Sequence, residues 1–528
     1  MSLLRYTSDM HSALLSSRFD QETSRTAVAI VGLSVAAAAL LKAWKATSST
    51  LDLPGPAGWP VIGNLFQLGE NWSETFSRWS KTFGPVYKVR LGNRDVVVVN
   101  TVDAAKALFL DQGSAYTSRP YFYTFHGVFT NHAAPTIGTS FWNDSTRRKR
   151  RAVATAMNKP KVQSYVPIIE AEAHALVKEI YTKSNAGQTP LDPYTYFQRL
   201  ALNTSLEVHF GTRLNAVEDS LFKEVAEVTA KVAGVRAVTG SLQDYLPFLR
   251  YLPNNKASSQ AAGYAKRRKI FMDHFLDEVI ERVKHNEDIP CIMSSILRDP
   301  ENELSRPEMD SISASMVSAG LDTFANTMIW SVGLLASRPD IQEKAQKAIE
   351  EVYGDRAPDP YEEKVDYISA LVKECSRYFT VFRLSLPRAT TADSKWGGTV
   401  IPAGSTVFMN AWALNFDDNV FDDPWEFRPE RYMVEDLQGT NLFAFGLGRR
   451  MCPGVHLASR EMYISFLYVL YYFKIRKSVD TEEQNYDIHP LTGVHKAQAF
   501  SVAPKRFKVM FEPRHQDHFK TNILERSV

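Results

Sequence analysis

The residues best suited to chemistry lie in one glycine-rich loop, Phe445-Gly446-Leu447-Gly448-Arg449-Arg450-Met451-Cys452-Pro453-Gly454. Cys452 stands directly before an apolar stretch, residues 455–472, that predicts a helix. A cysteine at a helix start lies near unpaired backbone N–H groups and the positive end of the helix dipole, and both favour the thiolate over the thiol. The glycines allow a large planar ligand to approach closely, and Arg450 offers a cation to an anionic group. Taken by itself, Cys452 is more simply interpreted as a buried structural cysteine.

A second unusual stretch is Ser318-Ala319-Gly320-Leu321-Asp322-Thr323. It falls in the middle of a segment that predicts an uninterrupted helix, although helix propensity disfavours Gly, Asp and Thr. A helix that keeps such residues has either a packing reason or a chemical one. The plain alternative for Thr323 is a hydroxyl bonded back to its own helix.

Glu374 and Arg377 lie three residues apart on a predicted helix, residues 366–379. An exposed pair of this kind would contribute only ~0.3 kcal/mol. The segment Phe427-Arg428-Pro429-Glu430-Arg431-Tyr432 follows before the Cys452 loop and adds a third candidate, Arg431. A buried network of these three side chains would hold its surroundings rigid.

These stretches, in this order, resemble the signatures of the cytochrome P450 family. The pattern Phe-x-x-Gly-x-Arg-x-Cys-x-Gly resembles its haem-thiolate loop, and Ala-Gly-x-Asp-Thr resembles the oxygen-binding motif of its central helix. Glu374, Arg377 and Arg431 resemble its Glu/Arg/Arg cluster. The resemblance covers residues 53–514.

The resemblance implies a mainly α fold with small β-sheets and a haem b cofactor. Cys452 is then the axial iron ligand, with the cofactor-binding positions Phe445, Arg450, Gly454 and Arg388, the last resembling a propionate-binding residue. Gly320 would let the cofactor and dioxygen approach the helix, and Asp322 and Thr323 would relay protons. Electrons would come from NADPH through a cytochrome P450 reductase. Thiolate donation favours cleavage of the O–O bond.

One departure from the family concerns a basic run, residues 147–151. Family members often carry Trp-x-x-x-Arg here, on a helix near the cofactor that faces the redox partner. This chain has Trp142, but its first arginine is Arg147, one position late. The sequence leaves open whether Arg147 takes the place of the usual propionate arginine beside Trp142.

The substrate side resembles fungal phenylacetate and hydroxyphenylacetate hydroxylases, through residues 318–323, Leu386-Pro387-Arg388 and Thr136-Ile137-Gly138-Thr139-Ser140. This resemblance implies hydroxylation of a small aromatic acid or aromatic amino-acid derivative. Aromatic residues between 121 and 141, among them Phe125 and Phe129, would cover the pocket. Arg383 either faces solvent or holds a substrate carboxylate.

Two other functions stay open on the sequence. One is a biosynthetic enzyme that hydroxylates or couples an aromatic precursor. The other is a non-catalytic haem-binding or sensor protein, which would need no proton relay and therefore no Asp322-Thr323 pair.

The elements that must position these residues are also visible. Ser305 and Glu308 form a capping box for a helix that runs to Ser337, where Arg338-Pro339 ends it. Residues 64–83 predict a helix. Residues 86–91 and 96–100 flank Gly92-Asn93 and predict a hairpin.

The chain ends predict its organisation. Residues 26–41 are an uncharged, largely apolar run, which predicts a membrane anchor over about 26–44 within an N-terminal segment of residues 1–52. A proline-rich link, a catalytic domain over 53–514 and a polar tail over 515–528 follow. The family's microsomal members place such a domain on the cytosolic side of the endoplasmic reticulum membrane. A net charge of +2 argues against nucleic acid as a partner, and three scattered cysteines argue against a disulfide framework.

Overall fold

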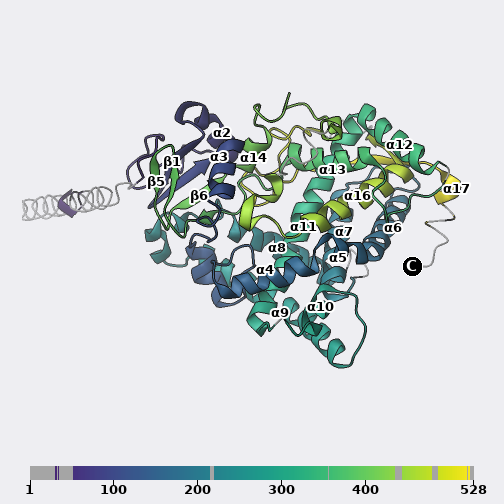
Figure 1. The fold of residues 1–528 in the computed structure, drawn as a ribbon, viewed down its shortest axis with the longest axis horizontal. Coiled ribbons are helices and arrows are strands. Elements are labelled where there is room, and N and C mark those ends of the chain that lie inside the picture. Colours follow the sequence, from purple (N-terminus) through teal and green to yellow (C-terminus); the bar gives the residue numbers. More distant parts are fainter. Residues whose placement is uncertain are drawn as a thin grey trace, which may run out of the picture.

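Helices make up most of the molecule, and the sheets are small and lie toward its edges, as Figure 1 shows. The computed structural model describes residues 30–32, 34, 38, 51–214, 219–301, 303–354, 356–434, 443–478, 486–519, 521 and 523. The predicted mainly α fold with small sheets is confirmed.

The described helices, in chain order, are α2 (Trp72–Phe83), α3 (Val102–Lys106), α4 (Asp144–Ala156), α5 (Lys159–Ser164), α6 (Val166–Lys183), α7 (Tyr194–Phe210), α8 (Ser220–Arg236), α9 (Lys256–Lys284), α10 (Ile292–Arg298), α11 (Arg306–Ser337), α12 (Pro339–Tyr353), α13 (Asp366–Phe379), α14 (Ala411–Asn415), α16 (Val455–Tyr472) and α17 (Gln516–Phe519). Short turns of π-helix cover Ala107–Asp111 and Tyr123–Val128.

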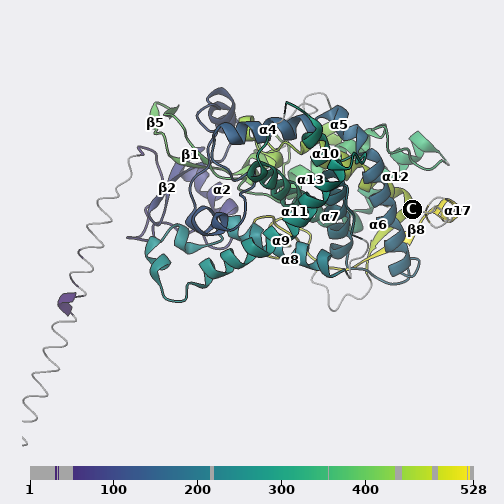
Figure 2. The same ribbon diagram turned by 90° about the horizontal axis from the view of Figure 1, so that it is seen from below.

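The longest element, α11, crosses the middle of the molecule, with α4 on one side and α9 on the other (Figure 2). Its predicted start is confirmed, because the backbone N–H of Ser305 donates to the Glu308 carboxylate at 2.9 Å in a capping box. At 1.5 Å per residue, its 32 residues span roughly 48 Å. Together with α6, α7, α13 and α16 it surrounds the largest hydrophobic core.

One sheet contains β1 (Val86–Leu91), β2 (Arg94–Val99), β6 (Thr406–Met409) and β3 (Arg388–Ala389), in that spatial order. The predicted hairpin is β1–β2, and β6 runs parallel to β2. Because strand residues alternate in direction, Val97 and Val99 enter one core cluster while Val96 and Val98 enter another. The two-stranded sheets are β4 (Ser394–Trp396) with β5 (Thr399–Ile401), and β7 (Phe473–Lys477) with β8 (Val509–Pro513).

The predicted helix over 64–83 is wrong for residues 64–71. The helix α2 begins only at Trp72, because Gly69 has a φ of +62° and Asn71 caps the new start by accepting from the N–H of Glu74. Within the predicted polar tail, Phe519 is 1% exposed and stacks on Tyr181 with ring centroids 4.4 Å apart.

Most of the predicted anchor, residues 26–44, lies outside the described residues. Residues 30–32, 34 and 38 are helical. Within the described part of the chain, none of the helices has the length and apolar character needed to cross a bilayer.

Candidate active site

A cavity of about 280 Å³ lies between α11, α16, α7 and the Cys452 loop. One face of α11 enters it through side chains at helical spacing, namely Met316, Ala319, Gly320, Thr323 and Thr327. Cys452 lies on the lining contributed by the loop before α16. The sequence-predicted thiol and hydroxyl groups therefore meet at one cavity.

The Cys452 loop is closed by its own backbone. The N–H of Cys452 donates to the carbonyl of Phe445 at 2.9 Å, and the N–H of Met451 donates to Gly448 at 2.9 Å. Gly446 and Gly448 have φ of +79° and +65°, which side-chain-bearing residues rarely adopt. The predicted need for glycine holds at these two positions.

Gly454 has another role, because its φ is −89°. A Cβ there would lie 3.3 Å from the Met157 side chain and 3.8 Å from the Cys452 sulfur. This glycine therefore leaves room beside the thiol.

The thiol of Cys452 is subject to opposing influences. Burial raises its pKa, while the backbone N–H of Gly454 and the charge of Arg150 act to lower it. The helix start was expected to favour the thiolate by itself, but the low polarity around the sulfur outweighs it. A thiolate here calls for a positive partner, as a metal ion provides.

Four arginines surround the cavity near this loop. Arg388 and Arg450 were predicted, and the structure adds Arg119 and Arg150, which the sequence did not single out. Arg388, Arg450 and Arg119 are buried, and burial lowers their pKa values, as does the charge of the neighbouring arginines. Arg119 lies in no recognisable motif, and the basic run 147–151 gives no signal that distinguishes Arg150 from its neighbours.

The hydrogen bonds of this cluster are incomplete. Arg119 donates to the carbonyls of Gly138, Leu386 and Pro387 at 2.7 Å each. Nη1 of Arg388 and Nε and Nη1 of Arg450 have no partner among the described residues. The neighbouring charges that act on Arg119, Arg388 and Arg450 are those of other arginines. Buried cations without a counter-charge are costly, so the cluster fits an anionic ligand with more than one carboxylate.

The stretch Ser318–Thr323 in the middle of α11, called the α11 notch below, both packs against a neighbouring helix and lines the cavity. A Cβ on Gly320 would lie 2.3 Å from the hydroxyl of Ser205 on α7, so glycine here lets two helices approach closely. Thr323 donates its hydroxyl to the carbonyl of Ala319 at 2.6 Å, which is the back-bond that was the plain alternative, and it still lines the cavity.

Asp322 does not line the cavity itself. Burial raises the pKa of Asp322 to about 6, and the charge of Arg236 opposes that rise. Any exchange of protons between Asp322 and the cavity therefore has to pass through its neighbours.

Glu374, Arg377 and Arg431 are brought together as predicted from their types. The Glu374 carboxylate accepts from both Nε and Nη2 of Arg377 at 2.8 Å and from Nε of Arg431 at 3.2 Å. All three are at most 3% exposed. The two arginines also donate to carbonyls of residues 415–426, which ties α13 to the chain that leads to the Cys452 loop.

Phe125 and Phe129 do not line the cavity. Their rings stack on each other with centroids 5.1 Å apart, and the guanidinium of Arg268 lies over Phe129. Both rings are buried in the hydrophobic core and not on the cavity wall.

Trp142 does not line the cavity, but its ring centroid lies 5.8 Å from the guanidinium of Arg450, which does. Arg147 is mostly exposed and pairs with Asp144. Arg150, one turn further along α4, lines the cavity instead. Arg150 lies four residues after Thr146, the position where the family pattern starting at Trp142 would place its arginine, and residues four apart share a face of a helix.

The solvent-facing interpretation of Arg383 is wrong, because this residue is 4% exposed. It lines a smaller pocket and not the central cavity. Its segment is a turn and not a strand, which removes the alternation argument. Its guanidinium lies 4.4 Å from the ring centroid of Trp412 and donates to the carbonyl of Pro490.

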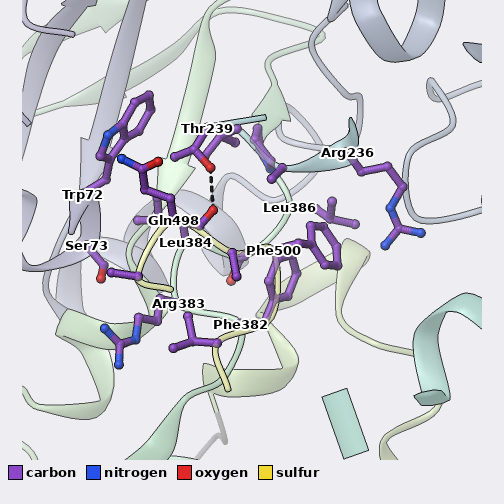
Figure 3. Close-up of a pocket in the computed structure, with 17 residues that line it drawn as sticks. Trp72, Ser73, Arg236, Thr239, Phe382, Arg383, Leu384, Leu386, Gln498 and Phe500 are labelled. Carbon is purple, nitrogen blue, oxygen red and sulfur yellow. Dashed lines mark hydrogen bonds between the residues drawn. The ribbon is translucent and has the colours of Figure 1, made fainter. Parts of the chain in front are cut away.

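A smaller pocket of about 40 Å³ adjoins the central cavity (Figure 3). Phe382, Phe500 and Arg236 line both spaces. The rings of Phe382 and Phe500 lie 4.5 Å apart, and the guanidinium of Arg236 lies 4.4 Å from Phe500. No sequence pattern signalled this group, because its members come from α8 and two separate loops.

Comparison with known proteins agrees with this geometry. The family model described as Cytochrome P450 matches residues 53–511. The chain is 50% identical to cytochrome P450 monooxygenase CYP3 of Mycosarcoma maydis, over 93% of this chain and 92% of that protein. It is 42% identical to 3-hydroxyphenylacetate 6-hydroxylase of Emericella nidulans (89% and 91% covered) and 40% identical to phenylacetate 2-hydroxylase of the same organism (88% and 90%). The chain therefore belongs to the cytochrome P450 family and is a monooxygenase of that family.

Proposed function

We propose that this monooxygenase hydroxylates the ring of a small aromatic acid. The observation that carries the proposal is the apolar cavity that joins the Cys452 thiol, the α11 notch and the Phe382/Phe500 pair. Two relatives named for hydroxylating phenylacetate and 3-hydroxyphenylacetate, at 40% and 42% identity, support an aromatic acid as substrate.

Haem b fits the residues of this site. Cys452 would hold the iron, and Arg388 and Arg450, which have unpartnered N–H groups, would pair with the two propionates beside Arg119. Phe445 and Gly454 would border the cofactor beside the thiolate. When bound, the haem supplies the iron that activates dioxygen for insertion into a C–H bond.

The residues of the chain orient the substrate, exclude water from the cavity and supply protons. The apolar wall of α11 and the Phe382/Phe500 pair exclude water and hold the ring. Thr323 offers a hydroxyl on the cavity wall, and Asp322, one residue earlier, would supply protons to it. The reaction takes one dioxygen, two electrons and two protons, and it returns the hydroxylated acid and water.

Electrons would come from NADPH through a cytochrome P450 reductase. The α4 face supports this partner, because Arg147 and Arg148 are largely exposed there while Arg150 of the same helix reaches the cavity. We also propose that residues 26–44 anchor the protein in the endoplasmic reticulum membrane with the catalytic domain in the cytosol. Ile30 and Val31 support the anchor, as helical apolar residues that are 59% and 62% exposed.

The test uses the full chain, loaded with haem, together with a cytochrome P450 reductase and NADPH. Phenylacetate and 3-hydroxyphenylacetate are supplied under isotopically labelled dioxygen. The expected result is a ring-hydroxylated acid that carries one labelled oxygen. Turnover of neutral phenols to coupled dimers, with no product from either acid, would establish oxidative coupling and overturn this proposal.

The ligand assignment has its own test. Cys452→Ala is expected to abolish the thiolate signature in the reduced CO difference spectrum, whereas Cys375→Ala, at a buried cysteine outside the cavity, is expected to keep it. Retention of the signature by Cys452→Ala would remove Cys452 as the ligand.

A further inference from the structure

Arg236 is the last residue of α8 and borders two spaces at once. It lines the central cavity and also the smaller pocket beside it. Figure 3 shows its guanidinium at the side of the pocket opposite to that of Arg383. The remaining arginines on the central cavity, namely Arg119, Arg150, Arg388 and Arg450, form the cluster near the Cys452 loop, where they repel one another. Arg236 therefore stands apart from the cations that suit the cofactor.

The immediate surroundings of Arg236 are aromatic. Its guanidinium lies 4.4 Å from the ring centroid of Phe500, and Phe500 in turn lies 4.5 Å from Phe382. Arginine stacked on a ring keeps the edge of its planar fork open to a carboxylate. This arrangement places an apolar wall for a ring next to a cation for an acid group.

The local charges leave room for one more anion. Arg268 of α9, which is 1% exposed, lies close enough to Arg236 for the two cations to repel. Asp322 is the carboxylate that offsets the charge of Arg236. Nε of Arg236 and Nη1 of Arg268 have no hydrogen-bond partner among the described residues. The half-buried Arg236 and the buried Arg268 share one carboxylate, so one positive charge is left without an anion.

We propose that Arg236 binds the carboxylate of the substrate while Phe382 and Phe500 hold its aromatic ring. This inference rests on the proposed function, because it names the residue that selects acids over neutral aromatics. Arg236 replaces Arg383 as the acid-binding residue, since Arg236 lines the central cavity whereas Arg383 lines the smaller pocket alone. The guanidinium of Arg383 lies over Trp412 and donates to the carbonyl of Pro490. The predicted selectivity comes from a charge-assisted pair at the edge of an apolar cavity.

The test measures dissociation constants by optical titration of the haem-loaded full chain. The ligands are phenylacetate and its neutral analogue phenylacetamide, and the variants are Arg236→Gln and Arg236→Lys. The wild type is expected to bind phenylacetate at least tenfold more tightly than the amide. Arg236→Gln is expected to lose that preference while it binds the amide as before, and Arg236→Lys is expected to keep part of it.

Arg250→Gln is the matched control. Arg250 also stacks on a ring, 4.4 Å from the centroid of Tyr123, but lines neither space. It is expected to keep the wild-type preference. An intact CO difference spectrum in each variant shows that the cofactor site has formed.

The outcomes separate this inference from the proposed function. If the wild type hydroxylates phenylacetate and Arg236→Gln keeps the preference for the acid, Arg236 is not the acid-binding residue and the function stands. Loss of the preference in Arg383→Gln but not in Arg236→Gln leads to the same conclusion. If the wild type neither binds nor hydroxylates phenylacetate, the proposed function fails and the inference fails with it.

Discussion

Glu461 of α16 is a buried carboxyl group on the wall of the central cavity. Burial and the nearby Glu172 carboxylate raise its pKa from 4.5 to about 8. The folded protein therefore keeps Glu461 protonated at neutral pH, whereas the unfolded chain ionises it above about pH 4.5. Its contribution to stability is lost as the pH rises from about 4.5 to about 8.

Glu461→Gln removes this dependence. The variant is expected to gain up to about 4 kcal/mol over the wild type near pH 8, and the gain should vanish below about pH 4.5. Urea unfolding across this pH range measures the difference. Glu281→Gln, at an exposed position of α9, serves as the control. A difference that stays constant with pH would mean that Glu461 is ionised in the folded protein.

Thr323 tests the proton path. Its hydroxyl lines the cavity, while Ser331 makes the same bond to the carbonyl four residues earlier on α11 and is fully buried outside the cavity. Thr323→Ala is expected to lower product formation about a hundredfold while NADPH consumption continues, since a positioned proton donor contributes at least that much. Ser331→Ala should keep the wild-type ratio of product to NADPH. Equal ratios in both variants would contradict a relay through Thr323.

The sequence predicted the residues whose neighbours along the chain define them. Cys452, Thr323 and the Glu374/Arg377 pair stand in short local patterns, so their types and spacing were enough. Arg119, Arg150 and Arg236 could not be found in this way, because each reaches the cavity only through the packing of separate elements. Arg383 misled the prediction because a β-like composition formed a turn.

At the scale of elements, the Cys452 loop docks against the π-helical turn Ala107–Asp111. Gly448 makes the contact, since a Cβ there would lie 2.1 Å from the carbonyl oxygen of Phe109. Gly446 has a similar backbone conformation, but the nearest atom to its Cβ would be 3.9 Å away. Substitution of Gly446 therefore tests backbone strain alone, whereas substitution of Gly448 tests backbone strain together with a steric clash.

Gly446→Ala is expected to cost about 1–2 kcal/mol, because a residue with a side chain is strained in the left-handed conformation. Gly448→Ala adds the clash with Phe109 and is expected to cost about 2–5 kcal/mol and to lower the haem content. Unfolding experiments and the absorbance ratio of haem to protein measure the two effects. Equal losses in the two variants would show that the loop does not press on the turn.

The elements were predicted most accurately where both ends carried a signal. The capping box at Ser305 and the stop at Arg338-Pro339 defined α11, and the polar turn defined the hairpin of β1 and β2. The start of α2 was missed because apolar residues recur at helical spacing on both sides of Gly69 and Asn71. Gly69 interrupts the helical conformation and Asn71 caps the helix that starts after it.

At the scale of the whole molecule, the C-terminal segment is part of the core. Phe519 packs on Tyr181 and contacts Tyr472 edge-on at 5.2 Å between centroids, which joins α17 to α6 and α16. Phe519→Ala is expected to cost about 3–5 kcal/mol of unfolding free energy. The control Phe248→Ala, at a residue that is 54% exposed, should cost less than about 1 kcal/mol. A loss of less than about 1 kcal/mol in Phe519→Ala would show that the segment does not stabilise the domain.

The mutually repelling arginines at the cavity have a consequence for the abundance of the protein in the cell. Newly made chains would carry this repulsion until an acidic cofactor binds, so cofactor binding is expected to stabilise the folded protein. The steady-state amount of enzyme should then follow haem supply, and chains left empty should be the first to be degraded by proteases. Through these charges, the cell's haem supply would regulate the abundance of the enzyme.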